Sequence, residues 1–179
     1  MAWIFSLSAE CGAEEAQAQQ FAQHFEGMTW LLSNDRQCQC QSDRFQDLEG
    51  NWWCRVRPRN LSEVGIDAPE SAYLMTELGI LLYQRLQTAP AFRYALVGVE
   101  VDEFRTYGEL VNEFDSTAPH VSMPGLVLSR EISQTLKVNS GFQAFSSNYV
   151  WQPYAGEIYN PLMVSPDLKN KLNELLVVR

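Results

Sequence analysis

The sequence predicts one α+β domain, built from a mostly antiparallel sheet with helices packed on one face. Three observations lead to this prediction. Apolar residues recur with the periods of strands and helices in the order β-α-β-β-β-α-β over residues 2–101. The helices are too few for a doubly wound parallel sheet. The chain has 179 residues, of which 46% are hydrophobic, enough to bury a sizeable core.

The first part of the chain alternates strand, helix and strand. Residues 2–7 carry apolar side chains on both faces of an extended segment, which predicts a strand buried on both sides. Residues 12–26 show a helical pattern that ends at Gly27, a common helix stop. Its apolar stripe consists of Ala18, Phe21, Ala22 and Phe25. Residues 28–32 then predict a second strand.

A hairpin or meander is expected between about residues 36 and 57. Residues 37–41 alternate polar and cysteine side chains with period two, which favours a half-buried strand. Gly50 and Asn51 indicate a turn. Residues 52–57 indicate the next strand, which Pro58 ends because proline cannot continue a ladder of hydrogen bonds.

The strongest helical pattern covers residues 69–88. It is apolar most of the way round, because Ile80 and Tyr83 lie opposite the main apolar face. Such a helix is either buried between two layers or part of an interface, so a homodimer through this helix is one expectation. Residues 92–101 then form a long strand with apolar side chains on both faces, which places it in the middle of a sheet.

The C-terminal third is less regular. Residues 107–114 fit either a helix or a strand, and residues 142–151 are extended. Ser129 is a suitable N-cap for a short helix that ends near Leu136. Ser165, Pro166 and Asp167 open a C-terminal helix.

We expect residues 1–179 to form one domain. A boundary at residues 116–125 is the one alternative, and that segment is short enough to be an ordinary loop. A ferredoxin-like core with C-terminal additions is one concrete version of the fold, since its chain order is β-α-β-β-α-β.

Charge and composition narrow the classes of partner. The chain has 13 Lys and Arg against 22 Asp and Glu, a formal charge of −9. This excess of carboxylates argues against nucleic acid and anionic membranes as partners, and favours a basic protein or a small ligand. The N-terminal residues lack a positively charged region, and no apolar run reaches the ~18 residues of a membrane span. We therefore expect a cytoplasmic protein with reduced thiols.

The common signs of catalysis are missing from the sequence. Its two histidines, His24 and His120, lie near no second metal ligand or nucleophile in the sequence. Cys38 and Cys40 are two residues apart, whereas metal sites more often use CxxC pairs. A glycine-rich phosphate loop and a GxSxG motif are also lacking. We therefore predict no catalytic residue, metal or cofactor, and lean towards a protein that is not an enzyme.

Two charged segments are candidates for binding. Arg55 and Arg57, followed by Arg59, project from one face of a predicted strand, where they could hold an anionic ligand or pair with carboxylates of the fold. Residues 100–115 are rich in carboxylates, among them Glu109 and Glu113. These could form a docking patch for a basic partner, a divalent-ion site or a solvated surface.

Residues 142–162 mix aromatic rings with polar side chains, a composition common at binding surfaces. Trp151, Tyr154, Tyr159 and Trp52 are the candidates for lining a site there. The alternative is that these rings fill the core.

Two hypotheses for function follow. The first is a non-enzymatic protein-binding or accessory module, of the inhibitor or immunity type, that masks a basic partner through the acidic surface. The second is a small-molecule-binding protein or enzyme with an aromatic pocket, in which Arg55 or Arg57 holds an anionic group. The first predicts a shallow aromatic patch with acidic residues around it, and the second a deep pocket.

Overall fold

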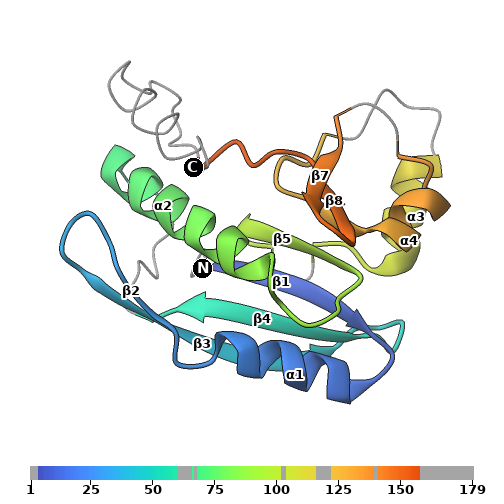
Figure 1. Cartoon of the computed structure of the whole chain (residues 1–179), viewed down its shortest axis with the longest axis horizontal. Coiled ribbons are helices and arrows are strands. Elements are labelled where there is room, and N and C mark those ends of the chain that lie inside the picture. Colours follow the sequence, from blue (N-terminus) through green and yellow to red (C-terminus); the bar gives the residue numbers. More distant parts are fainter. Residues whose placement is uncertain are drawn as a thin grey trace.

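The computed structural model describes residues 4–59, 66, 68–101, 104–115, 122–138 and 141–157. In this part of the chain eight strands form one antiparallel sheet in the order β2-β3-β4-β1-β5-β6-β8-β7, and four helices pack on it (Figure 1). The strands are β1 (Phe5–Gly12), β2 (Thr29–Leu31), β3 (Gln37–Gln46), β4 (Trp52–Pro58), β5 (Tyr94–Val99), β6 (Val127–Ser129), β7 (Gln143–Ser146) and β8 (Tyr149–Trp151). The helices are α1 (Glu15–Phe25), α2 (Pro69–Leu86), α3 (Tyr107–Asp115) and α4 (Arg130–Thr135).

The predicted α+β fold with a mostly antiparallel sheet is confirmed. The predicted order of elements up to residue 101 is also found, from β1 to β5. Residues 107–114, which fitted either a helix or a strand, belong to α3. The Ser129 side chain caps α4 as expected, with its Oγ accepting the Ile132 N–H at 3.3 Å. The predicted helix after Ser165 lies outside the described residues.

The central strand β1 is buried along its whole length. The sequence predicted a strand buried on both sides at residues 2–7, and the observed strand continues to Gly12. Leu7, Ala9 and Cys11 point to one face of the sheet and belong to its larger core cluster. Ser6, Ser8 and Glu10 alternate with them and point to the other face. Strands β4 and β5 pair with β1 on its two sides, so β1 is enclosed on both edges as well.

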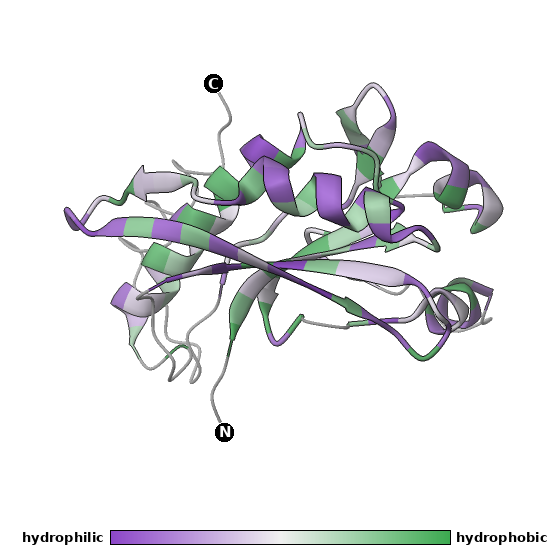
Figure 2. Cartoon of the chain, turned by 90° about the horizontal axis from the view of Figure 1, so that it is seen from below, coloured by the Kyte–Doolittle hydropathy of each residue, from purple (hydrophilic) through white to green (hydrophobic). Residues whose placement is uncertain are grey.

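The two long helices cover the first face of the sheet (Figure 1). The predicted apolar stripe of α1 is buried there, and Gly27 follows the helix with a positive φ of 72°. Helix α2 packs beside it through Met75, Leu78 and Leu82. Figure 2 shows the twist of the sheet and the alternation of hydrophilic and hydrophobic residues along its strands.

The second face of the sheet has a smaller core of its own, which refines the expectation that all helices share one face. Trp53, Tyr94 and Leu128 point to this side, because they alternate along their strands with residues of the first core. Because these side chains are large and apolar, they must be shielded from water by another element of the fold. Leu110 of α3 and Ile132 of α4 supply it.

Four strands and two helices have an arrangement compatible with the expected ferredoxin-like core. In the chain they follow the order β1-α1-β3-β4-α2-β5, with the short β2 added before β3. In the sheet the four strands lie in the order β3-β4-β1-β5, all antiparallel. The ferredoxin-like core remains an interpretation of this topology.

The sheet is narrowly joined between β5 and β6, which pair through Tyr94–Leu128 and Ala95–Val127. Beyond these pairs Tyr83 of α2 links β5 to the loop that precedes β6. Its hydroxyl donates to the Gly125 carbonyl oxygen at 2.8 Å and accepts the Val97 N–H at 3.1 Å. Segment 152–157 packs beside it, with the Tyr154 ring 5.1 Å from the Tyr83 ring.

This packing explains the apolar far side of α2. Tyr83 is 4% exposed, and Ile80 is half-buried against the same core. Of the two expectations for this helix, the structure therefore shows burial between layers, and a homodimer through it remains a prediction. In the described part of the chain, no helix combines the length and apolar character needed to cross a membrane.

Candidate functional site

The arginines of β4 are paired within the fold. Arg55 lies directly opposite Asp43 of β3 and forms an ion pair with it, with Nη2 2.6 Å from Oδ2. Arg57 contacts the other oxygen of the same carboxylate at 3.4 Å. The Arg55 guanidinium also lies over the Phe45 ring, 5.7 Å from its centre. One carboxylate thus holds both guanidinium groups that could have bound an anionic ligand.

The acidic candidates Glu109 and Glu113 belong to α3, where both have structural contacts. Glu109 accepts the Thr106 N–H at 2.9 Å, which caps the start of the helix. Glu113 forms an ion pair with Arg105. Glu49, from the β3–β4 turn, accepts the Gly108 N–H at 3.1 Å and the Thr106 hydroxyl at 2.7 Å. We use the name acidic α3 face for the carboxylates of α3 and of the adjoining turn, which are Glu49, Glu109, Glu113 and Asp115. At about 100° per residue, Asp115 lies on the other side of the helix from Glu113.

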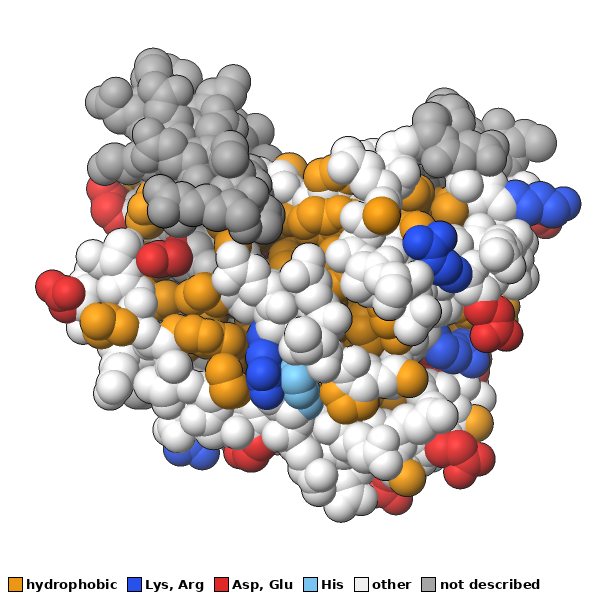
Figure 3. Space-filling model, in the orientation of Figure 1, with side chains coloured by type: hydrophobic (Ala, Val, Ile, Leu, Met, Phe, Trp, Pro, Cys, Tyr) orange, Lys and Arg blue, Asp and Glu red, His pale blue; other side chains and the backbone are white. Residues whose placement is uncertain are grey.

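The aromatic candidates pack mainly into the core. Tyr154 is 6% exposed, and its hydroxyl donates to Glu157 at 2.8 Å. Trp151 is half-buried, with its ring 5.3 Å from that of Tyr83. Trp52 is half-buried against the first core, whereas Tyr159 lies outside the described residues. Figure 3 shows apolar side chains between α2 and the β7–β8 hairpin, with carboxylates towards the rim of that face.

The structure does not bring the aromatic and arginine candidates together. Trp52, Trp151 and Tyr154 pack with the first core. Arg55 and Arg57 alternate with Trp52 along β4 and therefore point to the opposite face. Arg55 and Arg57 therefore do not lie among these rings.

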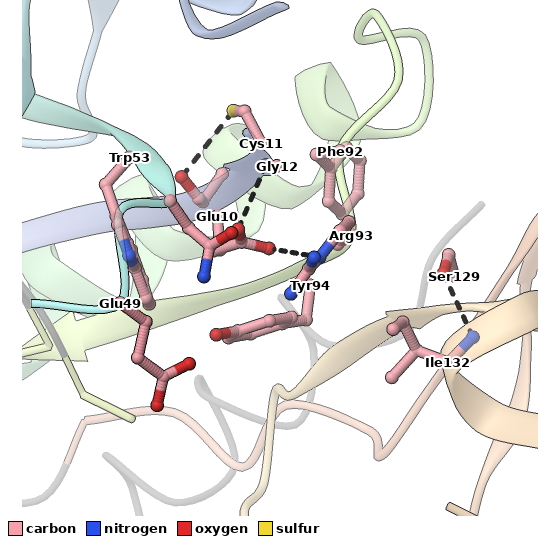
Figure 4. Close-up of polar contacts among 12 residues, drawn as sticks. Glu10, Cys11, Gly12, Glu49, Trp53, Phe92, Arg93, Tyr94, Ser129 and Ile132 are labelled. Atoms are coloured by element: carbon pink, nitrogen blue, oxygen red, sulfur yellow. Dashed lines mark hydrogen bonds and ion pairs between the residues drawn. The ribbon is translucent and has the colours of Figure 1, made fainter. Parts of the chain in front are cut away.

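The most unusual chemical group in the fold is one that the sequence reasoning missed, the carboxyl group of Glu10. It is 0% exposed and lies on the second face of the central strand. Its direct cross-strand neighbours are Trp53 on β4 and Tyr94 on β5 (Figure 4). The Phe104 ring packs edge-on against both of these neighbours, 5.6 Å from the Trp53 ring and 5.8 Å from the Tyr94 ring.

The polar contacts of Glu10 are few. Its Oε1 accepts the Gly12 N–H at 3.0 Å, and its Oε2 lies 2.7 Å from Nε of Arg93 (Figure 4). The latter contact is an ion pair without hydrogen-bond alignment, so Oε2 and Arg93 Nη2 have no hydrogen-bond partner within the described chain. The other side of the Arg93 guanidinium lies over the Tyr107 ring, 4.4 Å from its centre.

Burial raises the pKa of Glu10 from 4.5 to about 7, because water is excluded from the charged form. The Arg93 charge and the Gly12 N–H oppose this rise, and the nearby Asp47 carboxylate adds to it. Asp47 itself is held by the Trp53 indole N–H at 2.9 Å and by the Glu49 and Asn51 backbone N–H groups. A buried carboxyl group that titrates near neutral pH is a common feature of functional sites.

The thiols and the described histidine are weaker candidates for a reactive or metal-binding group. All four cysteines are buried and free, and burial raises the pKa of Cys38 to about 11 and that of Cys40 to about 12. Such thiols are poor nucleophiles. The His24 ring nitrogen lies 3.1 Å from the Arg85 carbonyl oxygen, a contact between α1 and α2. The described residues contain no group of three His, Cys, Asp or Glu side chains that could hold a metal ion.

A signal for Glu10 was present in the sequence. It is an acid within Phe5–Gly12, a strand whose other residues are small, apolar or hydroxylated. A charged residue in a strand buried on both faces requires a partner or a raised pKa. Its partner Arg93 is 83 residues away in the chain, so spacing could not reveal the pair.

Comparisons with protein-family models, curated proteins and solved structures find no match to this chain.

Proposed function

We propose that this protein is a non-enzymatic binding module that docks a basic protein through its acidic surface, as inhibitor and immunity-type proteins do. The observation that carries this proposal is the internal pairing of its arginines. Arg55 and Arg57 share Asp43, Arg93 pairs with Glu10, and Arg105 pairs with Glu113. These four positive charges are thus balanced by carboxylates of the same chain.

The exposed charges that remain are mainly negative. Among the described residues, ten carboxylate side chains are exposed against five cationic ones. Such an excess attracts a basic partner, speeds association and makes binding sensitive to salt. We choose the acidic α3 face as the contact surface. Glu49 binds the start of α3, so this contact adds an exposed carboxylate to those of the helix.

The proposed site of action is the cytoplasm. Four free, buried cysteines support a reducing compartment, since a secreted protein tends to pair its cysteines. A small-molecule pocket is the weaker candidate, because Asp43 already occupies Arg55 and Arg57.

The test begins with capture of partners from a lysate of the source organism on the immobilised protein, at low and at moderate salt. A basic protein retained specifically and lost as salt rises is expected. Its affinity is then measured by calorimetry against increasing salt, for the wild type and for the double variant Glu109→Gln, Asp115→Asn. These amide substitutions remove two charges and keep the side-chain shape, so affinity and salt dependence should both fall.

The matched control is Glu70→Gln, Glu131→Gln, which removes two exposed charges from α2 and α4. It should weaken binding less than the α3 variant. Equal effects of the two variants would overturn the choice of the α3 face. If no protein is retained at either salt, or if binding is indifferent to salt, the acidic docking function is wrong.

A further inference from the structure

We propose that residues 104–115, which include α3, form a cover over Glu10 that opens when Glu10 loses its proton. We call this segment the cover. The inference concerns the fold beneath the acidic α3 face, and it stands whether or not that face binds a partner.

The cover closes the second face of the sheet through aromatic and apolar contacts. Phe104 packs edge-on against both Trp53 and Tyr94, the two rings that flank Glu10. Leu110 of α3 is fully buried in the same cluster. With the cover in place, none of the Glu10 side chain reaches water.

Three polar contacts hold the start of the cover to the sheet. The Tyr94 hydroxyl donates to the Arg105 carbonyl oxygen at 3.0 Å. Glu49 accepts the Gly108 N–H, and the Arg93 guanidinium lies over the Tyr107 ring. The last contact links the cover directly to the ion-pair partner of Glu10.

The charged form of Glu10 is poorly solvated in the closed state. The charged and titratable groups next to it are Arg93, which directly precedes β5, Tyr94 of β5, and Asp47 of the β3–β4 turn. Glu49 of the same turn acts on Tyr94, and Tyr107 of the cover lies against Arg93. Cys11 neighbours Glu10 in β1 but points to the other face of the sheet. Arg93 is the cation among them, and its contact with Oε2 lacks hydrogen-bond alignment. Asp47 lies close enough to repel a second carboxylate.

Linkage then fixes the direction of the effect. If lifting the cover admits water to Glu10, its carboxyl group has a lower pKa in the open state than in the closed state. The open state therefore releases the proton more readily, and a rise in pH favours opening. At pH values below the Glu10 titration, the carboxyl group is neutral and the closed state is favoured.

The experiment is hydrogen exchange of the cover amides by mass spectrometry, at about pH 5.5 and about pH 8.5, corrected for the intrinsic pH dependence of exchange. If Glu10 has a pKa of about 7 in the closed state and its ordinary value of 4.5 when water reaches it, the opening constant should rise about 30-fold between these pH values. The opening constant should also exceed that of global unfolding, measured with denaturant at the same pH.

Two variants separate Glu10 from the other acids of the region. Glu10→Gln should abolish the pH dependence of opening, whereas Asp115→Asn, which removes an exposed carboxylate of the cover itself, should preserve it. The proposal is overturned if the cover exchanges only by global unfolding, if its opening is independent of pH, or if the dependence persists in Glu10→Gln.

A reciprocal test keeps the proposal falsifiable if Glu10→Gln does not fold. Phe104→Leu loosens the cover and leaves Glu10 in place. It should increase opening at every pH, and it should lower the midpoint of the Glu10 carboxyl titration, followed by carbon-13 NMR. An unchanged Glu10 midpoint in a Phe104→Leu protein with increased opening would refute the link between the cover and the proton.

Discussion

The hydroxyl group of Tyr83 offers the sharpest test of how the two parts of the sheet are joined. It is fully enclosed where β5 and β6 separate, and it satisfies two backbone groups, the Gly125 carbonyl and the Val97 N–H. Tyr83→Phe removes this one oxygen atom. The ring and its contacts with Phe145, Trp151 and Tyr154 can remain.

The size of the effect follows from the groups left unpaired. A buried polar group without a partner costs about 1–3 kcal/mol, and the substitution leaves two of them. Partial relaxation of the Gly125 loop would recover some of this cost. We therefore expect Tyr83→Phe to lower the free energy of unfolding by about 3 kcal/mol. For a chain of this length, that corresponds to a fall in Tm of about 9 °C.

The assay is urea unfolding followed by circular dichroism, with the slope m compared between variants to confirm that the denatured state is unchanged. Tyr73→Phe is the matched control, since Tyr73 lies on the same helix and its hydroxyl has no hydrogen bond among the described residues. It should change stability by less than about 0.5 kcal/mol. A Tyr83→Phe loss as small as that of the control would refute the bridging role of the hydroxyl group.

Three further predictions concern single groups. The folded state binds the Glu10 proton more tightly than the unfolded chain does. The free energy of unfolding, measured by urea titration, should therefore fall by about 2.5 kcal/mol from about pH 5 to about pH 8. A stability that does not change with pH, or an equal fall in Glu10→Gln, would contradict this. Gly79→Ala should destabilise the protein by about 1–3 kcal/mol, since the new Cβ would lie 2.7 Å from the Tyr154 hydroxyl oxygen; a gain of about 1 kcal/mol from helix propensity alone would show that Tyr154 moves freely. Ser129→Ala should cost about 1 kcal/mol by removing the cap of α4, and thermal unfolding indistinguishable from the wild type would show that the cap contributes nothing.

Local periodicity was sufficient for the elements that bury one continuous stripe or face. The α1 stripe lies in the core as its spacing requires, and β1 and β5 are central strands as their apolar faces indicated. Pro69 at the start of α2 and Ser129 at the start of α4 act as their residue types predict. In each case the information lies within a few residues of the chain.

Contacts across strands were beyond such reasoning. The arginines of β4 could be seen to share a face, but whether Asp43 or a ligand would meet them depends on the register of β3 and β4. The surroundings of Glu10 come from three separate strands, and Phe104 packs on the Trp53 ring beside it. Only the topology of the sheet brings these residues together, and the sequence left that topology open.

The position of β1 has a consequence for how the chain assembles. It is the first described strand in the chain, yet it lies in the middle of the sheet, between β4 and β5. Its nearest partner residues in β4 are at least 40 positions later in the chain. Its other edge pairs only with residues 94–99 of β5. A β3–β4 hairpin can form early, because its ends are close in sequence. Enclosure of β1 instead requires closing long loops, so we expect slow folding that is limited by this strand.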